Sequence, residues 1–290
     1  MERVTRKQLL AIATAIVAKD VDKVQALCRC IGTDDASIGT YRYFGERFAD
    51  WLDDTSAKPS GQIFTKGNSK LPFFKFSALP IVTCPGAGAC SILQFCYSLK
   101  SWRNPSAFFA QCRNTVLVLE QSEHLVNAWH KLPEGVPVRL YVDGDFDSLE
   151  TLEFWWCLLR AREDLQAYGY SKSFDILESY NGAWPTNYKL NLSSGANRAQ
   201  SDKLRNLPIT RGDFIALPIA KHLARLPNNA RYSSADYKRA LRLAGKAAGI
   251  EKAFLCPGKC GSCIKRGTEK GTHACGLASF QNIPILIGIH

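Results

Sequence analysis

Apolar side chains recur at helical spacing near the start of the chain. They do so in residues 9–17 and again in 21–27, and Asp20 between the two groups suits the N-cap of a second helix. Residues 41–52 repeat the spacing with aromatic side chains. The polar stretch that follows, with Pro59 and two glycines, has the composition of a linker. This pattern predicts a helical head over residues 1–65 and a second domain over residues 66–290.

Short apolar runs alternate with helical patterns in the second domain. The runs fall at residues 73–81, 138–142, 165–170, 188–193 and 214–218, and helical spacing marks residues 89–99, 105–129 and 149–162. Strands that alternate with helices are typical of an α/β fold with a parallel sheet. The sequence therefore predicts an α/β domain with a largely parallel sheet and flanking helices, built as an open sheet or as a partial or irregular barrel.

Composition places the chain among folded proteins. Its 290 residues are 46% hydrophobic and 22% charged, which excludes a disordered chain. The longest apolar stretches, residues 11–18 and 283–289, are shorter than the ~18–20 residues that a membrane span needs. The N-terminus has no signal-peptide pattern. We therefore expect a cytoplasmic protein with no membrane partner.

The charge of the chain is basic and unevenly distributed. The formal net charge is +11. Twelve acidic and five basic residues lie from Glu120 to Glu178, whereas sixteen basic and five acidic residues lie from Arg198 to His290. This balance favours an acidic partner, of which nucleic acid is the commonest, although a solvated helix face explains the same pattern. The candidate nucleic-acid contacts are Arg198, Arg231, Lys238, Arg239, Arg242 and Lys246.

Four cysteines near the C-terminus have the spacing of metal ligands. Cys256, Cys260 and Cys263 stand close together among glycines, and Cys275 follows. Glycines permit the tight turns that aim several thiolates at one ion. Four thiolates suit a four-iron four-sulfur cluster, which we favour, or a tetrahedral zinc ion. The alternative is a set of reduced thiols without metal.

A second group of cysteines, Cys84, Cys90 and Cys96, begins in a loop rich in proline and glycine. Three thiolates leave one coordination position open, which is where chemistry takes place in catalytic metal sites. Their spacing is wider than the compact one of radical-SAM enzymes. The early and late groups could also close on one shared cluster or on two neighbouring ones. The other four cysteines are better explained as core or surface thiols: Cys28, Cys30, Cys112 and Cys157.

Two aspartates stand where the run at residues 138–142 enters a glycine turn. The carboxyl ends of parallel strands carry the ligand and metal chemistry of α/β folds. Asp143 and Asp145 could act as acid and base or hold a divalent ion; in the alternative, Asp145 completes the turn and Asp147 or Ser148 caps the next helix. Lys172, which follows the next run, could offset their charge or bind a phosphate. These three are the candidate catalytic residues.

Several of these segments together resemble a known family. They are Cys-Pro-Gly-Ala at residues 84–87 with the cysteines after it, Gly-Asp-Phe at 144–146, Ser-Lys-Ser at 171–173 and the late cysteine cluster. The chain is similar in them, over residues 66–290, to a poorly characterised cysteine-rich family encoded by bacteriophages and plasmids. The wide gap before Cys96 departs from that pattern. The resemblance implies a mobile element in a bacterial host and distant kinship to iron–sulfur barrel enzymes.

Three functional hypotheses follow. The first is an iron–sulfur or zinc protein in which the metal organises the fold and the basic last third binds or processes nucleic acid. The second is a metal-dependent enzyme, radical-SAM-like or of another type, with an open three-cysteine site beside the candidate catalytic residues. The third is a non-catalytic interaction or inhibitor protein with structural metal.

Overall fold

A computed structural model describes residues 4–31, 40–67, 71–88, 96–224, 226, 228–258, 260 and 274–289 of the chain. Two predicted metal ligands, Cys90 and Cys263, lie outside these ranges, as does most of the helix predicted at residues 89–99. Within these ranges, a search for a helix that could cross a membrane finds none.

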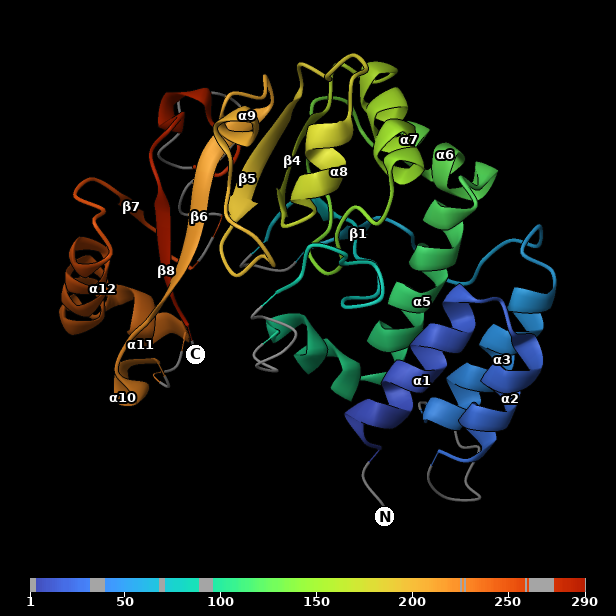
Figure 1. The fold of residues 1–290 in the computed structure, drawn as a ribbon. Helices are drawn as coiled ribbons and strands as arrows, with labels where there is room; N and C mark the ends of the chain where they lie inside the picture. The colour runs from blue at the N-terminus through green and yellow to red at the C-terminus, as the bar shows by residue number, and fades with distance from the viewer. Residues whose placement is uncertain are drawn as a thin grey trace.

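Three helices form the head at one end of the molecule (Figure 1). They are α1 (Arg6–Val17), α2 (Val21–Arg29) and α3 (Tyr41–Asp53). As the sequence indicates, Asp20 caps α2, because its carboxylate accepts the Lys23 backbone N–H at 3.0 Å. The head shares one apolar core with η1 (Tyr97–Arg103) and α5 (Pro105–Leu119), through Trp102, Phe108 and Phe109. Its helices are therefore packed into the second domain.

The centre of the fold is an eight-stranded sheet with the order β1-β2-β3-β4-β5-β6-β8-β7. Only β1 and β2 pair antiparallel, and all the other neighbours run parallel. The α/β prediction is confirmed, and the sheet is open and not closed into a barrel. The strands are β1 (Thr65–Lys66), β2 (Phe74–Lys75), β3 (Pro137–Arg139), β4 (Gln166–Ser171), β5 (Tyr188–Ser193), β6 (Thr210–Pro218), β7 (Phe254–Leu255) and β8 (Ile285–Ile289).

Helices cover one face of this sheet, which we call the helical face. Leu190 and Leu192 of β5 lie on it, in one core with Trp129, Trp155 and many other apolar side chains of the helices. The helices in this layer are α6 (Glu123–His130), α7 (Leu149–Arg160), α8 (Phe174–Ser179) and α9 (Asp202–Arg205). Beyond them, α10 (Lys221–Ala224), α11 (Asn228–Ser233) and α12 (Ala235–Ala247) lie at the end of the sheet away from the head (Figure 1).

The opposite face, which we call the second face, carries Tyr168, Tyr170 and Phe214. In β3, β4 and β5 the register aligns Arg139, Tyr168 and Lys189 in one row across the sheet. Phe280 of η2 (Ala278–Phe280) packs on Phe254 at this face. Cys256, Cys260 and Cys275 belong to the same cluster.

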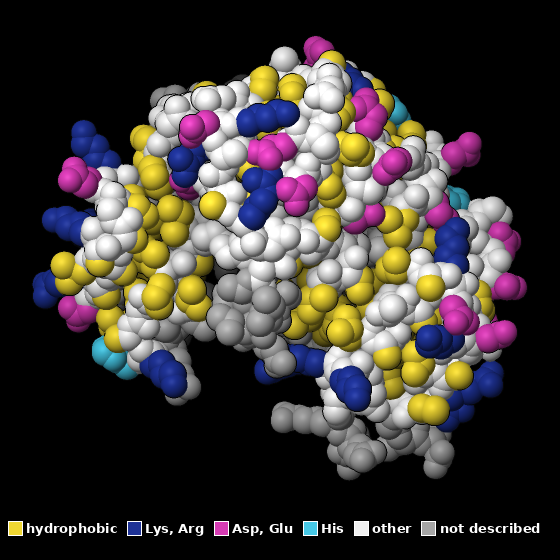
Figure 2. Space-filling view, viewed as in Figure 1, with side chains coloured by type: hydrophobic (Ala, Val, Ile, Leu, Met, Phe, Trp, Pro, Cys, Tyr) yellow, Lys and Arg dark blue, Asp and Glu magenta, His cyan; other side chains and the backbone are white. Residues whose placement is uncertain are grey.

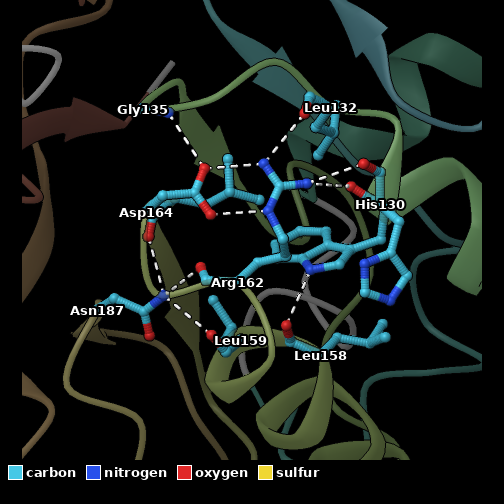
Figure 3. A network of polar contacts seen from close by, with 10 residues as sticks. His130, Leu132, Gly135, Leu158, Leu159, Arg162, Asp164 and Asn187 are labelled. Atoms are coloured by element: carbon cyan, nitrogen blue, oxygen red, sulfur yellow. Dashed lines mark hydrogen bonds and ion pairs between the residues drawn. The ribbon is translucent and has the colours of Figure 1, made fainter.

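Polar contacts hold the amino ends of the strands (Figure 3). Asn187 is buried, and its amide nitrogen lies within 3.1 Å of the backbone oxygens of Leu159, Arg162 and Leu165. The Arg162 guanidinium pairs with Asp164 and donates to the carbonyls at the end of α6. This end of the sheet is therefore occupied by structural contacts.

Some predicted elements differ from the observed ones. The helix predicted at residues 105–129 is two helices, α5 and α6, because Gln121 between them has a left-handed φ of 50°. The strand predicted at residues 138–142 ends at Arg139, and Tyr141 also has a positive φ, of 50°. Arg231, which we expected on the same helix as Lys238, lies in α11, one turn before α12 begins.

Candidate metal centre and neighbouring sites

Three of the four late cysteines pack in one apolar cluster on the second face. Cys256 directly follows β7, and its backbone N–H donates to the Leu286 carbonyl of β8 at 2.9 Å. Cys260 and Cys275 join it in one cluster with Tyr168 and Tyr170. Burial raises the pKa of the Cys275 thiol, and the neighbouring Cys256 raises it further. Cys275 is thus brought into one layer with two thiols that lie fifteen and nineteen residues earlier in the sequence.

Asn191 fixes the backbone at Cys275. Its amide nitrogen donates to the Cys275 carbonyl at 2.9 Å and to the Gly169 carbonyl at 3.0 Å. Asn191 is fully buried and stands in the middle of β5. The last cysteine is therefore tied to the two central strands of the sheet.

Arg211 is the polar side chain that sequence reasoning missed here. It is 0% exposed, and its Nε donates to the Asn191 Oδ1 at 2.6 Å. Its other N–H groups donate to backbone carbonyls of Asp213, Phe280 and Ile283. Nothing in the sequence separates this arginine from the exposed basic residues around it. The orientation of Asn191 could be predicted from the sequence. It stands between Leu190 and Leu192 in a strand, so its side chain points to the face opposite the one on which these leucines lie.

No metal site is formed by the side chains that the structure describes: within those ranges no group of three or more His, Cys, Asp or Glu residues could hold an ion. Cys256, Cys260 and Cys275 lie within those ranges and do not form such a group, and Cys263, the fourth predicted late ligand, is outside them. The early group is likewise incomplete, since only Cys84 and Cys96 are described.

Cys84 of the early group lies near the carboxyl ends of the strands, in a different environment. Burial raises the pKa of the Cys84 thiol, and the nearby Asp145 carboxylate raises it further. The loop that carries Cys84 crosses the strand ends closely: a Cβ on Gly86 would lie 1.8 Å from the Lys172 carbonyl oxygen. The Gly86 carbonyl in turn accepts the backbone N–H of Asn197, after β5. Cys84, Asp145 and Lys172 are therefore neighbours, as the second hypothesis requires.

Asp145 is held by the backbone on both sides. It is 4% exposed; its Oδ1 accepts the Phe146 N–H at 2.8 Å and its Oδ2 accepts the Lys172 N–H at 2.7 Å. Burial raises the pKa of this carboxyl, and the Lys172 N–H opposes the rise. The Lys172 ammonium itself donates to the Ser193 hydroxyl at 3.0 Å. Asp145 thus joins the turn after β3 to the end of β4.

Asp143 points to a different neighbourhood. Its Oδ2 accepts a hydrogen bond from the Gln111 amide at 3.0 Å, and its backbone carbonyl accepts the Ala78 N–H at 2.9 Å. Burial raises the pKa of its carboxyl, while a hydrogen bond from Ser98 lowers it. The two predicted catalytic aspartates are therefore separated by their contacts: Asp145 belongs with Lys172, and Asp143 with α5 and η1.

The predicted nucleic-acid contacts divide into two kinds. Arg198 pairs with Asp175 and Glu178, and Arg231 is buried with its guanidinium on the Leu226 carbonyl. Those two are engaged within the fold. The other four lie on α12, whose Tyr237 and Leu241 face the sheet: Lys238, Arg239, Arg242 and Lys246.

The outer face of α12 is cationic and open. Arg239, Arg242 and Lys246 are exposed, as is Leu243 at 61%. Within the described ranges, no ion pair involves any of the four basic side chains of this helix. Lysine and arginine side chains project along this edge of the molecule, with fewer acidic ones between them (Figure 2).

Comparison with known proteins gives one match. A family model described as gene product 88 matches residues 51–279, which is well over half of the chain. The matched region begins inside α3 and includes both cysteine segments and every strand of the sheet except β8. No curated protein and no solved structure matches the chain.

Proposed function

The chain belongs to the gene product 88 family, a family of phage type, and we propose that it is a cysteine-ligated metalloprotein that binds nucleic acid. The observation that supports the proposal is that Cys256, Cys260 and Cys275 pack in one cluster on the second face of the sheet. Cys263 is the fourth ligand that we propose. We also propose, from the sequence resemblance alone, a distant kinship to iron–sulfur barrel enzymes.

The donor chemistry supports a thiolate-bound metal. Four cysteine sulfurs without histidine or carboxylate suit a four-iron four-sulfur cluster or a zinc ion, both of which take four thiolates in tetrahedral geometry. The backbone at the site is held in advance, because Cys256 is fixed by the β7–β8 ladder and Cys275 by Asn191. A centre that binds there would join β7 and β8 to β4 and β5. Metal binding would then contribute directly to folding free energy.

The metal hypothesis is tested by purifying the protein without oxygen and measuring iron, sulfide and zinc. We expect about four irons per chain with a visible absorption band, or one zinc without colour. Cys260→Ser should lose the metal, whereas Cys157→Ser, which changes an exposed thiol of α7, should keep it. Wild-type protein that folds and carries neither metal would refute the proposal.

Nucleic-acid binding is assigned to the outer face of α12. Four cations on one helix face, with no acidic partner among the described residues, are suited to phosphate contacts. Replacing them all with Gln should weaken binding steeply and lower the salt dependence, by about three to four units of log K against log salt. The matched control changes four basic residues of the head in the same way: Arg6, Lys7, Lys23 and Arg29.

The control variant carries the same loss of net charge, so it separates a local contact from a general electrostatic effect. It should retain most of the affinity of the wild type. Equal losses in the two variants, or binding that ignores salt, would contradict an interface on α12.

A metal-dependent enzyme is the second candidate function. The observation that favours it is the position of Cys84 next to Asp145 and Lys172 at the carboxyl ends of parallel strands, where α/β folds bind their ligands. The test is spectroscopic: adding S-adenosylmethionine to anaerobic protein should perturb the spectrum of a cluster with an open iron. Loss of that change in Cys84→Ser, with the late centre intact, would support it. If S-adenosylmethionine does not change the spectrum, the early cysteines do not form an open cluster that binds it, and this second function is refuted.

A further inference from the structure

A lysine at the carboxyl end of β4 carries a charge that the described part of the fold does not pair. Lys172 directly follows β4, and its ammonium donates to the hydroxyl of Ser193, the last residue of β5, at 3.0 Å. Both residues are half-buried. Among the residues that the structure describes, no carboxylate lies within ion-pair distance of this ammonium. An ammonium has three N–H donors, so two of them and the charge remain for a group from outside the fold.

Asp145 anchors this lysine through its backbone. The buried carboxylate accepts the Phe146 N–H at 2.8 Å and the Lys172 N–H at 2.7 Å. It is therefore turned to the backbone of Lys172, whereas the lysine side chain extends to the neighbouring strand. Two N–H donors already stabilise the negative charge of the carboxylate. Asp145 thus fixes the start of the lysine side chain and leaves the ammonium at the end of β5.

The turn after β5 adds backbone donors beside the lysine. Gly195 has a left-handed φ of 79°, and a Cβ on it would lie 3.9 Å from the Lys172 Cε, so the lysine side chain runs along this turn. The N–H groups of Ser194 and Asn197 are bonded to backbone carbonyls. Between them, the N–H groups of Gly195 and Ala196 have no acceptor within the described ranges. Neighbouring N–H groups that the fold does not use are the donors from which anion-binding turns are built.

Ser173 adds a buried hydroxyl at the same strand end. The residue is 1% exposed, and its Oγ has no hydrogen-bond partner among the described residues. It lies beneath the loop that follows Cys84, because a Cβ on Gly86 would be 2.8 Å from the Ser173 nitrogen. A buried polar group that the fold leaves unpaired is explained by a bound water, ion or ligand. Since Ser173 directly follows Lys172, an anion held by the ammonium is a candidate acceptor for this hydroxyl.

We propose that the carboxyl ends of β4 and β5 form an anion site that takes a phosphoryl group. Its ligands are the Lys172 ammonium, the Ser193 hydroxyl and the free N–H groups of Gly195 and Ala196. Several donors of this kind suit a tetrahedral group with three acceptor oxygens better than a planar carboxylate with two. The carboxyl ends of parallel strands are also where α/β folds bind their ligands. The inference goes beyond both candidate functions, because it needs neither a metal nor α12.

The first test uses inorganic phosphate as the probe, titrated into the full chain and followed by calorimetry. Lys172→Gln removes the charge and should weaken phosphate binding at least about tenfold, as is typical when a charged hydrogen-bond donor is lost. The matched control is Lys203→Gln, which removes an exposed cation between β5 and β6 that donates to the Glu178 carbonyl. It should leave the affinity within about twofold of the wild type. Equal losses in the two variants would overturn the site.

A second measurement needs no variant, so it stays decisive if Lys172→Gln does not fold. An acetylating reagent is applied to the wild type, and the labelled peptides are quantified by mass spectrometry. Phosphate should slow the labelling of Lys172 and leave that of Lys203 unchanged, compared with sodium chloride at the same ionic strength. Labelling of Lys172 that phosphate does not slow, or that chloride slows equally, would overturn the proposal.

The same protection assay distinguishes two sources of the phosphoryl group. If the ligand is a small phosphorylated molecule, a nucleoside 5′-monophosphate should protect Lys172 and a duplex oligonucleotide should not. If the ligand is the backbone of nucleic acid, the oligonucleotide should protect Lys172, and Lys172→Gln should lower the salt dependence of its binding by about one unit of log K against log salt. Protection by neither compound would overturn a phosphoryl ligand, whatever the outcome for α12 or for the metal.

Discussion

Removing the Asp145 carboxylate should destabilise the fold strongly. In Asp145→Ala, the backbone N–H groups of Phe146 and Lys172 lose their acceptor in a site that is 4% exposed. A buried donor left unpaired costs about 1–3 kcal/mol, so the two together cost about 2–6 kcal/mol. That is a large share of the 5–15 kcal/mol typical of a folded domain. Asp145→Asn keeps one acceptor and no charge, and should cost about 1–2 kcal/mol.

Urea unfolding followed by circular dichroism measures these losses, with metal-free and metal-loaded protein compared separately. The pH dependence gives an independent check. Because burial raises the folded-state pKa of Asp145 above its unfolded value, its contribution is fully present below about pH 3.9 and is lost as pH rises through the folded pKa. Wild type should therefore lose stability relative to Asp145→Asn over that rise. A cost below about 1 kcal/mol for Asp145→Ala would show that the carboxylate does not hold the turn to β4.

Two further predictions concern the two ends of the sheet. Asn187→Ala removes the donor that serves three backbone carbonyls at the amino end (Figure 3), and should lower the free energy of unfolding by about 2–4 kcal/mol in urea. Gly86→Ala would place a Cβ 1.8 Å from the Lys172 carbonyl oxygen, so the loop must move away from the strand ends. We expect a loss of about 1–3 kcal/mol and faster reaction of Cys84 with a thiol reagent. In Gly249→Ala, where nothing lies within 4 Å, only the left-handed φ is strained, and Cys84 reactivity should not change.

The helices and central strands followed from the sequence where the local pattern and the packing agree. Residues 188–193 form the strand that alternation predicts, because Leu190 and Leu192 bury against the helical face. The break between α5 and α6 could not be predicted from the sequence. It depends on the left-handed backbone of Gln121, and glutamine is not a residue type that favours this conformation. The strand β8 was missed for another reason: a short, continuous apolar run is as compatible with a buried helix segment as with a strand.

The candidate site could be predicted from residue types but not from residue environments. The cysteine spacing directed attention to Cys256, Cys260 and Cys275, which pack in one cluster, and their role as metal ligands stays a prediction. The roles of the basic residues could not be predicted, because the sequence does not distinguish a buried arginine from an exposed one. Arg198 and Arg231 are used in internal contacts, and Arg211 is wholly buried, since each position is decided by distant segments that fold around it.

The position of the late cysteines has a structural reason. A parallel sheet needs both faces covered, and α6, α7, α8 and α9 pack on the helical face. After β7, the described residues Cys256 and Cys260 pack on the second face. Between Cys256 and Cys275 the apolar residues, other than cysteine, are Pro257, Ile264 and Ala274. A stretch of this composition gains little free energy from apolar burial. The proposed thiolate-bound metal would supply another source of stability, and this is why we propose a metal within the fold and nucleic-acid contact on α12.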